Sequence, residues 1–181
     1  MVRAKARVRA DPSPPLGTSH PSSRWRSSSI VSSWITNCRL NHRACAASKY
    51  DANELPRRLL DVKQREGAAV VLVEARDNAE CHVEQYATLS HCWGKARVIQ
   101  TTNENLALRM QVIEWDHLPK TFQDAVAIVQ ALGVRFLWID SPCIVQDDVL
   151  DWKQESVRMA AIYSNNYINI AATGSSDSRG G

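Results

Sequence analysis

The sequence lacks any apolar run of the roughly 20 residues that a helix needs to cross a bilayer. No apolar signal-peptide segment follows the first methionine, so we expect an intracellular, cytoplasmic protein without a membrane span. Its five cysteines are odd in number and include no C-x-x-C pair, which argues against a disulfide framework and against common zinc-site spacings. Glycine-rich phosphate loops of the usual kinds are also absent.

Acidic residues are scarce at the start of the chain. Residues 1–30 contain six Arg and Lys against Asp11 alone, whereas the rest of the chain carries 16 basic and 18 acidic residues. The folded part therefore has no basic face for nucleic acid. Residues 1–29 are rich in Arg, Ser and Pro, which predicts a disordered tail. A mitochondrial targeting segment is the alternative, although the period-two spacing of its basic residues does not place them on one helical face.

Hydrophobic spacing and turn residues predict a regular order of elements along the chain. They are a helix over about 29–40, strands over 58–62 and 69–74 with Gly67 between them, a strand over 83–90, a helix over 103–110, a helix over about 121–132, a strand over 134–139, a helix from about 149 and a strand over 167–171.

Two of the predicted helices carry terminal signals. Thr121 and Asp124 resemble a capping box with aspartate in place of glutamate, and Gly133 is placed to end that helix. Asp148 can cap the next helix. The apolar stripe of this second helix is expected to comprise Val149, Trp152, Ser156, Met159 and Tyr163.

The prediction of the fold and of the site depends most on one segment, RFLWIDSPCIVQDD at 135–148. Its continuous apolar run, 136–139, suits a strand that is covered on both faces, as in a parallel sheet flanked by helices. Helical crossovers after residue 83 favour parallel pairing. The segments SHCWG, DSPC and TGSS would then leave one edge of the sheet, where α/β proteins bind ligands.

Three blocks resemble the fungal heterokaryon incompatibility (HET) domain: 86–94, 118–126 together with 131–148, and 151–173. The upstream residues Trp34, Cys38, His42 and Cys45, with LPRRLLDV at 55–62, resemble its usual lead-in. We therefore divide the chain into a tail (1–29), a lead-in of a helix and short strands (30–82) and a HET core (83–181) whose C-terminal part we expect to be missing. Pro142 departs from the leucine usual in the family, and it removes a backbone donor and restricts Ser141.

The resemblance implies a cell-death effector of fungal non-self recognition, with a flavodoxin-like fold distantly related to Toll/interleukin-receptor (TIR) domains. Enzymes of the TIR class cleave NAD with a glutamate in a W-C-x-x-E pattern, and the resemblance implies that Trp152 and Glu155, in W-K-Q-E, match the spacing of that pattern. This interpretation names Glu155 as catalytic and NAD as substrate, since a carboxylate stabilises the oxocarbenium character of glycosidic cleavage. The pocket would be lined by Ser90, Trp93, Asp140 and Ser141.

Each of these carboxylates also has a structural interpretation. Glu155 can pair with Arg158 on a solvated helix face, and Asp140 can accept backbone hydrogen bonds in a loop. Asp147 and Asp148 suit the N-terminus of a helix. The protein as a whole would then be a non-catalytic module that self-associates and recruits other cell-death proteins, or an inactive truncated remnant.

Thiol and metal chemistry have less support from the sequence. Cys143 and His91 could meet across neighbouring loops, but nothing in their spacing indicates a nucleophile pair. Cys38, His42 and Cys45 could share a helical face, with Cys81 and His82 completing a zinc site. Because no C-x-x-C pair occurs, we assign no metal ligand at this stage.

Overall fold

The computed structural model describes residues 24–46, 51–63, 70–76, 82–94 and 99–173, and the chain divides into two units, Met1–Lys49 and Tyr50–Gly181. The predicted tail before residue 24 and the turn at Gly67 lie outside the described residues. No helix among the described residues is both long and apolar enough to span a membrane.

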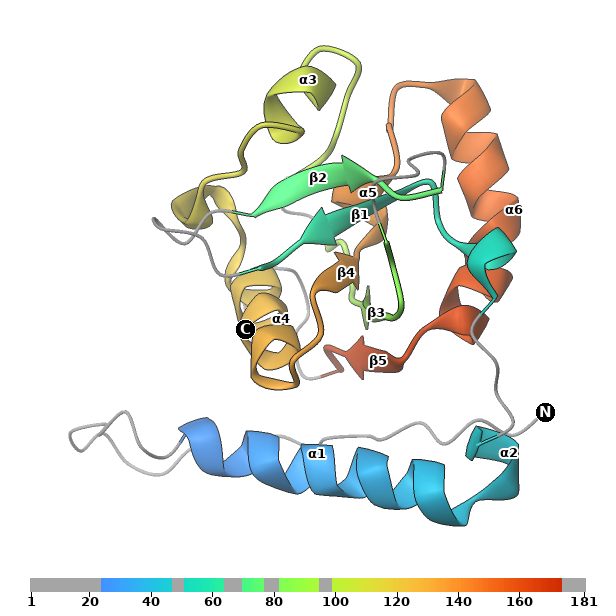
Figure 1. Cartoon of the computed structure of the whole chain (residues 1–181). Helices are drawn as coiled ribbons and strands as arrows, with labels where there is room; N and C mark the ends of the chain where they lie inside the picture. Colours follow the sequence, from blue (N-terminus) through green and yellow to red (C-terminus); the bar gives the residue numbers. More distant parts are fainter. Residues whose placement is uncertain (1–23, 47–50, 64–69, 77–81, 95–98, 174–181) are drawn as a thin grey trace. The chain divides into compact units, whose positions relative to one another are not determined.

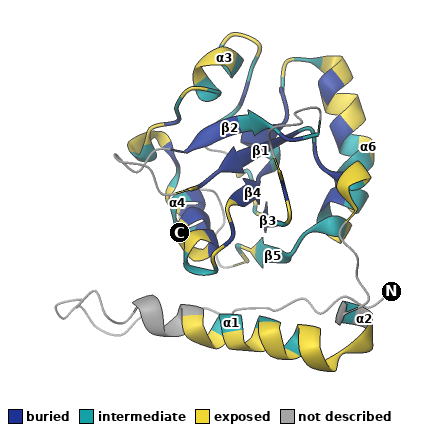
Figure 2. Cartoon of the chain, in the orientation of Figure 1, coloured by how far each residue is buried: buried dark blue, intermediate teal, exposed yellow. Residues whose placement is uncertain are grey.

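The first unit contains two helices, α1 (Arg24–Asn41) and the short α2 (Arg43–Ala46). The predicted helix is confirmed, although it begins at Arg24 and so includes the last residues of the predicted tail. Its described side chains are mostly exposed, and those of Ile30, Trp34 and Leu40 are at least half exposed (Figure 2). None of the described side chains of this helix is buried, so together they form no buried apolar face.

The second unit is built on a five-stranded sheet in the order β2-β1-β4-β3-β5 (Figure 1). The strands are β1 (Arg58–Asp61), β2 (Val71–Glu74), β3 (Tyr86–Ser90), β4 (Phe136–Trp138) and β5 (Ile168–Ala171). The other helical elements are η2 (Ala52–Glu54), α3 (Leu106–Arg109), η3 (Trp115–His117), α4 (Lys120–Ala131), α5 (Asp140–Cys143) and α6 (Val149–Asn165). The class is α/β, as predicted.

The sheet is mixed. β3 pairs in parallel with both β4 and β5, which confirms the expectation for the chain after residue 83. β1 runs antiparallel to β4 and to β2, so the expectation of a mostly parallel sheet does not extend to the first two strands. β4 lies between β1 and β3 and is wholly buried, as its continuous apolar run predicted.

The helix before the central strand ends as predicted but begins differently. Gly133 has φ of 71°, and Val134 N donates to Val129 O at 3.1 Å, which is the pattern of a glycine-ended helix.

The predicted capping box at the start of α4 is wrong: the N-cap is Pro119 and makes no side-chain bond. Thr121 is buried, and Asp124 pairs with Lys120 one turn earlier. The Pro119 carbonyl accepts from the N–H groups of Phe122 and Gln123 at 2.9 and 3.0 Å, so the helix starts on backbone hydrogen bonds without a side-chain cap.

The segment DSPC, which we predicted as a loop, forms the short helix α5. Pro142 lies in the first turn of this helix, where its missing N–H would have no helical partner, so the departure from leucine is accommodated. The segment is fixed from outside by Thr101, whose Oγ1 donates to Pro142 O at 2.6 Å and whose N–H donates to Ser141 O at 3.1 Å.

Helix α6 is capped as predicted, and its expected apolar stripe is confirmed in part, since Met159 and Tyr163 pack against the core. Asp148 accepts hydrogen bonds from the backbone N–H groups of Leu150 and Asp151. Val149 and Trp152, expected on the apolar stripe, are 65% and 50% exposed. The residues of this helix that are buried are Asp151, Glu155 and Ile162. Two carboxylates therefore lie on the buried face of this helix, where apolar side chains are usual.

Candidate functional site at the carboxyl edge of the sheet

Polar side chains from the ends of β3 and β4 meet at one edge of the sheet. The indole Nε1–H of Trp93 donates to Asp140 Oδ2 at 2.8 Å, and His91 Nδ1 lies 3.9 Å from Asp140 Oδ1. Asp140 Oδ1 also accepts from the N–H of Ser141 at 2.7 Å. We call His91, Trp93, Asp140 and Ser141 the sheet-edge cluster. Parallel strands deliver their carboxyl ends to the same edge, which explains the meeting.

Two buried polar atoms of this cluster have no hydrogen-bond partner among the described residues: Ser141 Oγ and His91 Nε2. Buried side-chain polar atoms are nearly always paired, because an unpaired one loses its hydration without compensation. Trp93 and Asp140 themselves are only half-buried. The cluster thus combines unpaired buried groups with a carboxylate and an indole that reach solvent, as a ligand site does.

The surroundings of His91 keep it neutral. Burial lowers the pKa of His91, and the nearby Asp140 carboxylate opposes this shift with a smaller effect. The ring also packs edge-on against Phe122, at 4.9 Å between centroids. A neutral imidazole has one nitrogen that accepts a hydrogen bond. His91 can therefore accept a hydrogen bond from a hydroxyl group of a ligand, or take up a proton from the ligand.

The fourth predicted pocket residue, Ser90, is the last residue of β3, and its side chain forms a hydrogen bond with Tyr163 of α6. The Tyr163 hydroxyl donates to Leu89 O at 3.2 Å. Burial and the negative charge of Asp140 raise the pKa of Tyr163 to about 12, and a hydrogen bond with the Ser90 side chain acts in the opposite direction. Ser90, Trp93, Asp140 and Ser141 therefore gather around one edge of the sheet.

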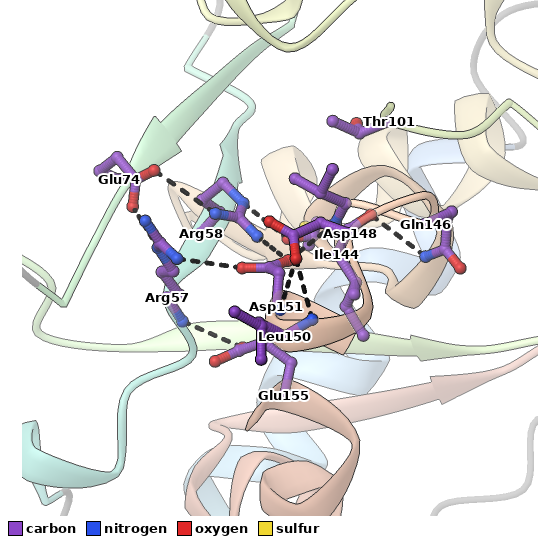
Figure 3. Close-up of polar contacts among 12 residues, drawn as sticks. Arg57, Arg58, Glu74, Thr101, Ile144, Gln146, Asp148, Leu150, Asp151 and Glu155 are labelled. Atoms are coloured by element: carbon purple, nitrogen blue, oxygen red, sulfur yellow. Dashed lines mark hydrogen bonds and ion pairs between the residues drawn. The ribbon is translucent and has the colours of Figure 1, made fainter. Parts of the chain in front are cut away.

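Glu155 belongs to a separate buried ion network, which we define as Arg57, Arg58, Glu74, Arg76, Asp151 and Glu155 (Figure 3 labels all but Arg76). Its centre is Asp151, which pairs with Arg58 and lies 3.2 Å from Arg57 Nη1. Asp151 Oδ2 also accepts from Val145 N at 2.8 Å. Arg58 Nε donates in turn to Cys143 O at 3.0 Å.

Both carboxylate oxygens of Glu155 are bonded. Oε1 accepts from Arg76 Nη2 at 2.6 Å, and Oε2 accepts from the backbone N–H of Arg57 at 3.1 Å. The residue is 1% exposed. It makes no hydrogen bond or ion pair with the sheet-edge cluster among the described residues. The structure thus places Glu155 and the four predicted pocket residues in different surroundings.

The expected surface pair of Glu155 with Arg158 is wrong. Arg158 instead donates to Asn53 O at 2.8 Å and lies 3.4 Å from Glu54 Oε2. The spacing argument for Glu155 is also off by one residue, because W-C-x-x-E separates Trp from Glu by four positions and W-K-Q-E by three. Trp152 is half exposed and contributes nothing to the network.

Sequence reasoning missed the arginines of the ion network. Arg57 and Arg58 stand in LPRRLLDV, which we interpreted as part of the lead-in and as a strand, without assigning a role to either arginine. A charged residue within an otherwise apolar strand is a signal for a buried partner, since an arginine is almost never fully buried unpaired. Arg58 is 1% exposed and is such a case.

The two cysteines that the structure describes in this unit, Cys92 and Cys143, lack the features of a nucleophile site. Burial raises the pKa of Cys143 to about 12, so its thiol stays protonated at neutral pH. Cys92 is exposed, while the His91 side chain is 2% exposed, so these two neighbours point in different directions just after β3 ends.

The fold and the site together define an α/β domain with a mixed five-stranded sheet and a polar cluster at the carboxyl edge of its parallel strands. Residues 86–181 match the model of the family described as heterokaryon incompatibility protein (HET). This match spans more than half of the chain, so the chain belongs to the HET family. No curated protein and no solved structure matches it.

Proposed function

We propose that this chain is a cell-death effector of fungal non-self recognition, and that it binds a nucleotide of the NAD type at the sheet-edge cluster. Membership of the HET family supports the first part. The observation that carries the second is the contact of 2.8 Å between Trp93 Nε1 and Asp140 Oδ2. It holds an aromatic face and a carboxylate side by side, and these are the groups that stack on a base and accept from ribose hydroxyls.

In the enzymatic form of this proposal, water replaces nicotinamide at the ribose carbon of NAD. A carboxylate is needed near that carbon, because positive charge develops there as the glycosidic bond breaks. Glu155 is the residue that we assign to this task from the family resemblance. Because its two carboxylate oxygens accept hydrogen bonds from Arg76 and from the backbone N–H of Arg57, catalysis would require the carboxylate to leave both partners and reach the substrate.

A second candidate function is a non-catalytic module that self-associates and recruits other cell-death proteins. Two observations favour it. Glu155 has the full set of partners expected of a structural residue. The outer face of α6 also carries apolar side chains that are at least half exposed, namely Val149, Leu150, Trp152 and Val157. Contiguous exposed apolar residues are typical of interaction surfaces.

The test is NAD binding and loss, measured on purified chain fused to an oligomerising tag. We compare wild type, Asp140→Asn, Glu155→Gln and Asp124→Asn, the last being a control on the exposed pair of α4. The proposal expects binding by wild type and by Asp124→Asn, with at least tenfold weaker binding by Asp140→Asn. Equal binding by Asp140→Asn would rule out the sheet-edge site.

The same samples separate the two candidate functions. Turnover by wild type that is absent from a still-folded Glu155→Gln protein would support Glu155 as the catalytic group. Turnover by both would keep the enzyme and discard Glu155. A folded, clustered wild type that neither binds nor cleaves NAD would leave the self-associating module, and Trp152→Ser should then weaken its self-association.

A further inference from the structure

Three soft metal ligands lie together at the end of α1, in the unit that precedes the sheet. The Sγ atoms of Cys38 and Cys45 are 3.2 Å apart, and His42 Nδ1 lies 3.2 Å from Cys38 Sγ. One ligand atom from each of the three residues lies within 4.8 Å of the others. Around a tetrahedral zinc ion, sulfur and nitrogen ligands lie roughly 3.5–3.8 Å apart, as follows from the usual bond lengths. Small side-chain rotations bring the three atoms to that spacing.

The backbone is what brings these residues together. Cys38 and His42 are one helical turn apart, and His42 N donates to Cys38 O at 3.0 Å, which closes the last turn of α1. Cys45 N then donates to His42 O at 3.0 Å as the chain enters α2. Ligands at positions i, i+4 and i+7 therefore share one side of the α1–α2 segment.

The three side chains are open to an ion. Cys38 and Cys45 are free thiols and are half-buried, and His42 is exposed. Two thiols in contact are also what a disulfide needs, but a disulfide gives no reason for an imidazole nitrogen on the same sulfur. Hydrogen bonding of thiols alone is weak compared with coordination, since the thiolate is the strong metal ligand.

We propose that Cys38, His42 and Cys45 bind one Zn²⁺, through two thiolates and the imidazole Nδ1. Thiolate and imidazole ligands select zinc over magnesium or calcium, which prefer oxygen. The two thiols lose their protons on binding, and the two thiolates together neutralise the charge of the zinc ion. Because protons are released, the affinity for zinc falls as the pH decreases. The fourth tetrahedral position is left to water or to another group. The ion would fasten α1 to α2.

The experiment uses the full chain, purified with a reductant and stripped of metal by a chelator. Cobalt(II) is added first, because thiolate coordination gives a charge-transfer band and a tetrahedral ligand field that are visible by absorption. Zinc then displaces the cobalt and reports the zinc affinity. The variants are Cys38→Ser, Cys45→Ser and His42→Ala, with Cys92→Ser as the matched control, since Cys92 is an exposed free thiol outside the cluster.

Wild type and Cys92→Ser should bind one equivalent of cobalt with a thiolate band and exchange it for zinc. Cys38→Ser and Cys45→Ser should bind zinc more than roughly 100-fold more weakly, beyond the 10- to 100-fold effect of losing an outer-shell partner. His42→Ala should keep the thiolate band but weaken binding. The proposal is overturned if the wild type shows no thiolate–cobalt band, if Cys92→Ser loses as much affinity as Cys38→Ser, or if a Cys38–Cys45 disulfide persists under reductant and excludes the metal.

Discussion

Replacing Asp151 by asparagine removes one negative charge from the buried ion network while keeping the shape of the side chain. The Asp151 carboxylate is 2% exposed, and its partner Arg58 is 1% exposed. Removing one member of a buried pair leaves the other charge without compensation, which destabilises a protein by about 3–5 kcal/mol. Glu74, 3.5 Å from Arg58 Nη1, remains as a partial counter-charge. We therefore expect a loss of about 3 kcal/mol.

That loss is a large fraction of the roughly 5–15 kcal/mol by which a domain is stable. For a unit of this size it lowers Tm by roughly 10 °C. Urea denaturation followed by tryptophan fluorescence measures it directly. The matched control is Asp124→Asn, which removes a carboxylate from the exposed Lys120–Asp124 pair of α4 and should change stability by only about 0.3–0.5 kcal/mol.

Two outcomes would refute this reasoning. The first is a loss for Asp151→Asn no larger than that for Asp124→Asn, which would mean that the network is solvated. The second comes from a double variant with Arg58→Met. Because the two residues are in direct contact, the combined loss should fall short of the sum of the single losses by about 1 kcal/mol or more. Simple additivity would show that the pair is not coupled.

Three further predictions follow from the same geometry. Burial lowers the pKa of His91 below 6.5, so the contribution of His91 to stability is present above pH 6.5 and is lost as the pH falls through the lowered pKa. The difference in Tm between about pH 8 and about pH 5 should therefore be smaller for His91→Gln than for wild type. Iodoacetamide should label Cys92 in the native protein but leave Cys143 unmodified until denaturant is added, and native labelling of Cys143, seen by mass spectrometry, would contradict its burial. Gly133→Ala should destabilise the protein by about 1 kcal/mol through strain alone, since φ is +71° and nothing lies within 4 Å of an added Cβ; an unchanged urea midpoint would count against it.

The local part of the fold was predictable from the sequence. The apolar run of β4 and the crossover helices on either side of it are encoded in consecutive residues, and the parallel order of β3, β4 and β5 follows from them. The position of β1 beside β4 was not predictable, because strand pairing across some 75 residues has no local signal. That long-range pairing joins the antiparallel pair β1–β2 to the parallel strands and so makes the sheet mixed.

The candidate site was also predictable from the sequence only in part. The meeting of Trp93 and Asp140 follows from topology, since both residues come directly after parallel strands. The environment of Glu155 was missed because hydrophobic periodicity treats acidic residues as exposed. Its partners, Arg76 and the backbone of Arg57, are distant in sequence and visible only once the chain has folded. The Cys38–His42–Cys45 grouping was visible as helical spacing, but the distances between its ligand atoms were not.

The ion network also bears on where the domain begins. The family match begins at residue 86, yet Arg57, Arg58 and Arg76 lie before it and hold Asp151 and Glu155 within it. A protein cut back to the matched residues would keep both buried carboxylates but lose all three arginines, and a buried charge without its partner is strongly destabilising. The strand pair β1–β2 and Arg76 therefore belong to the folding unit of this domain, although they precede the family match.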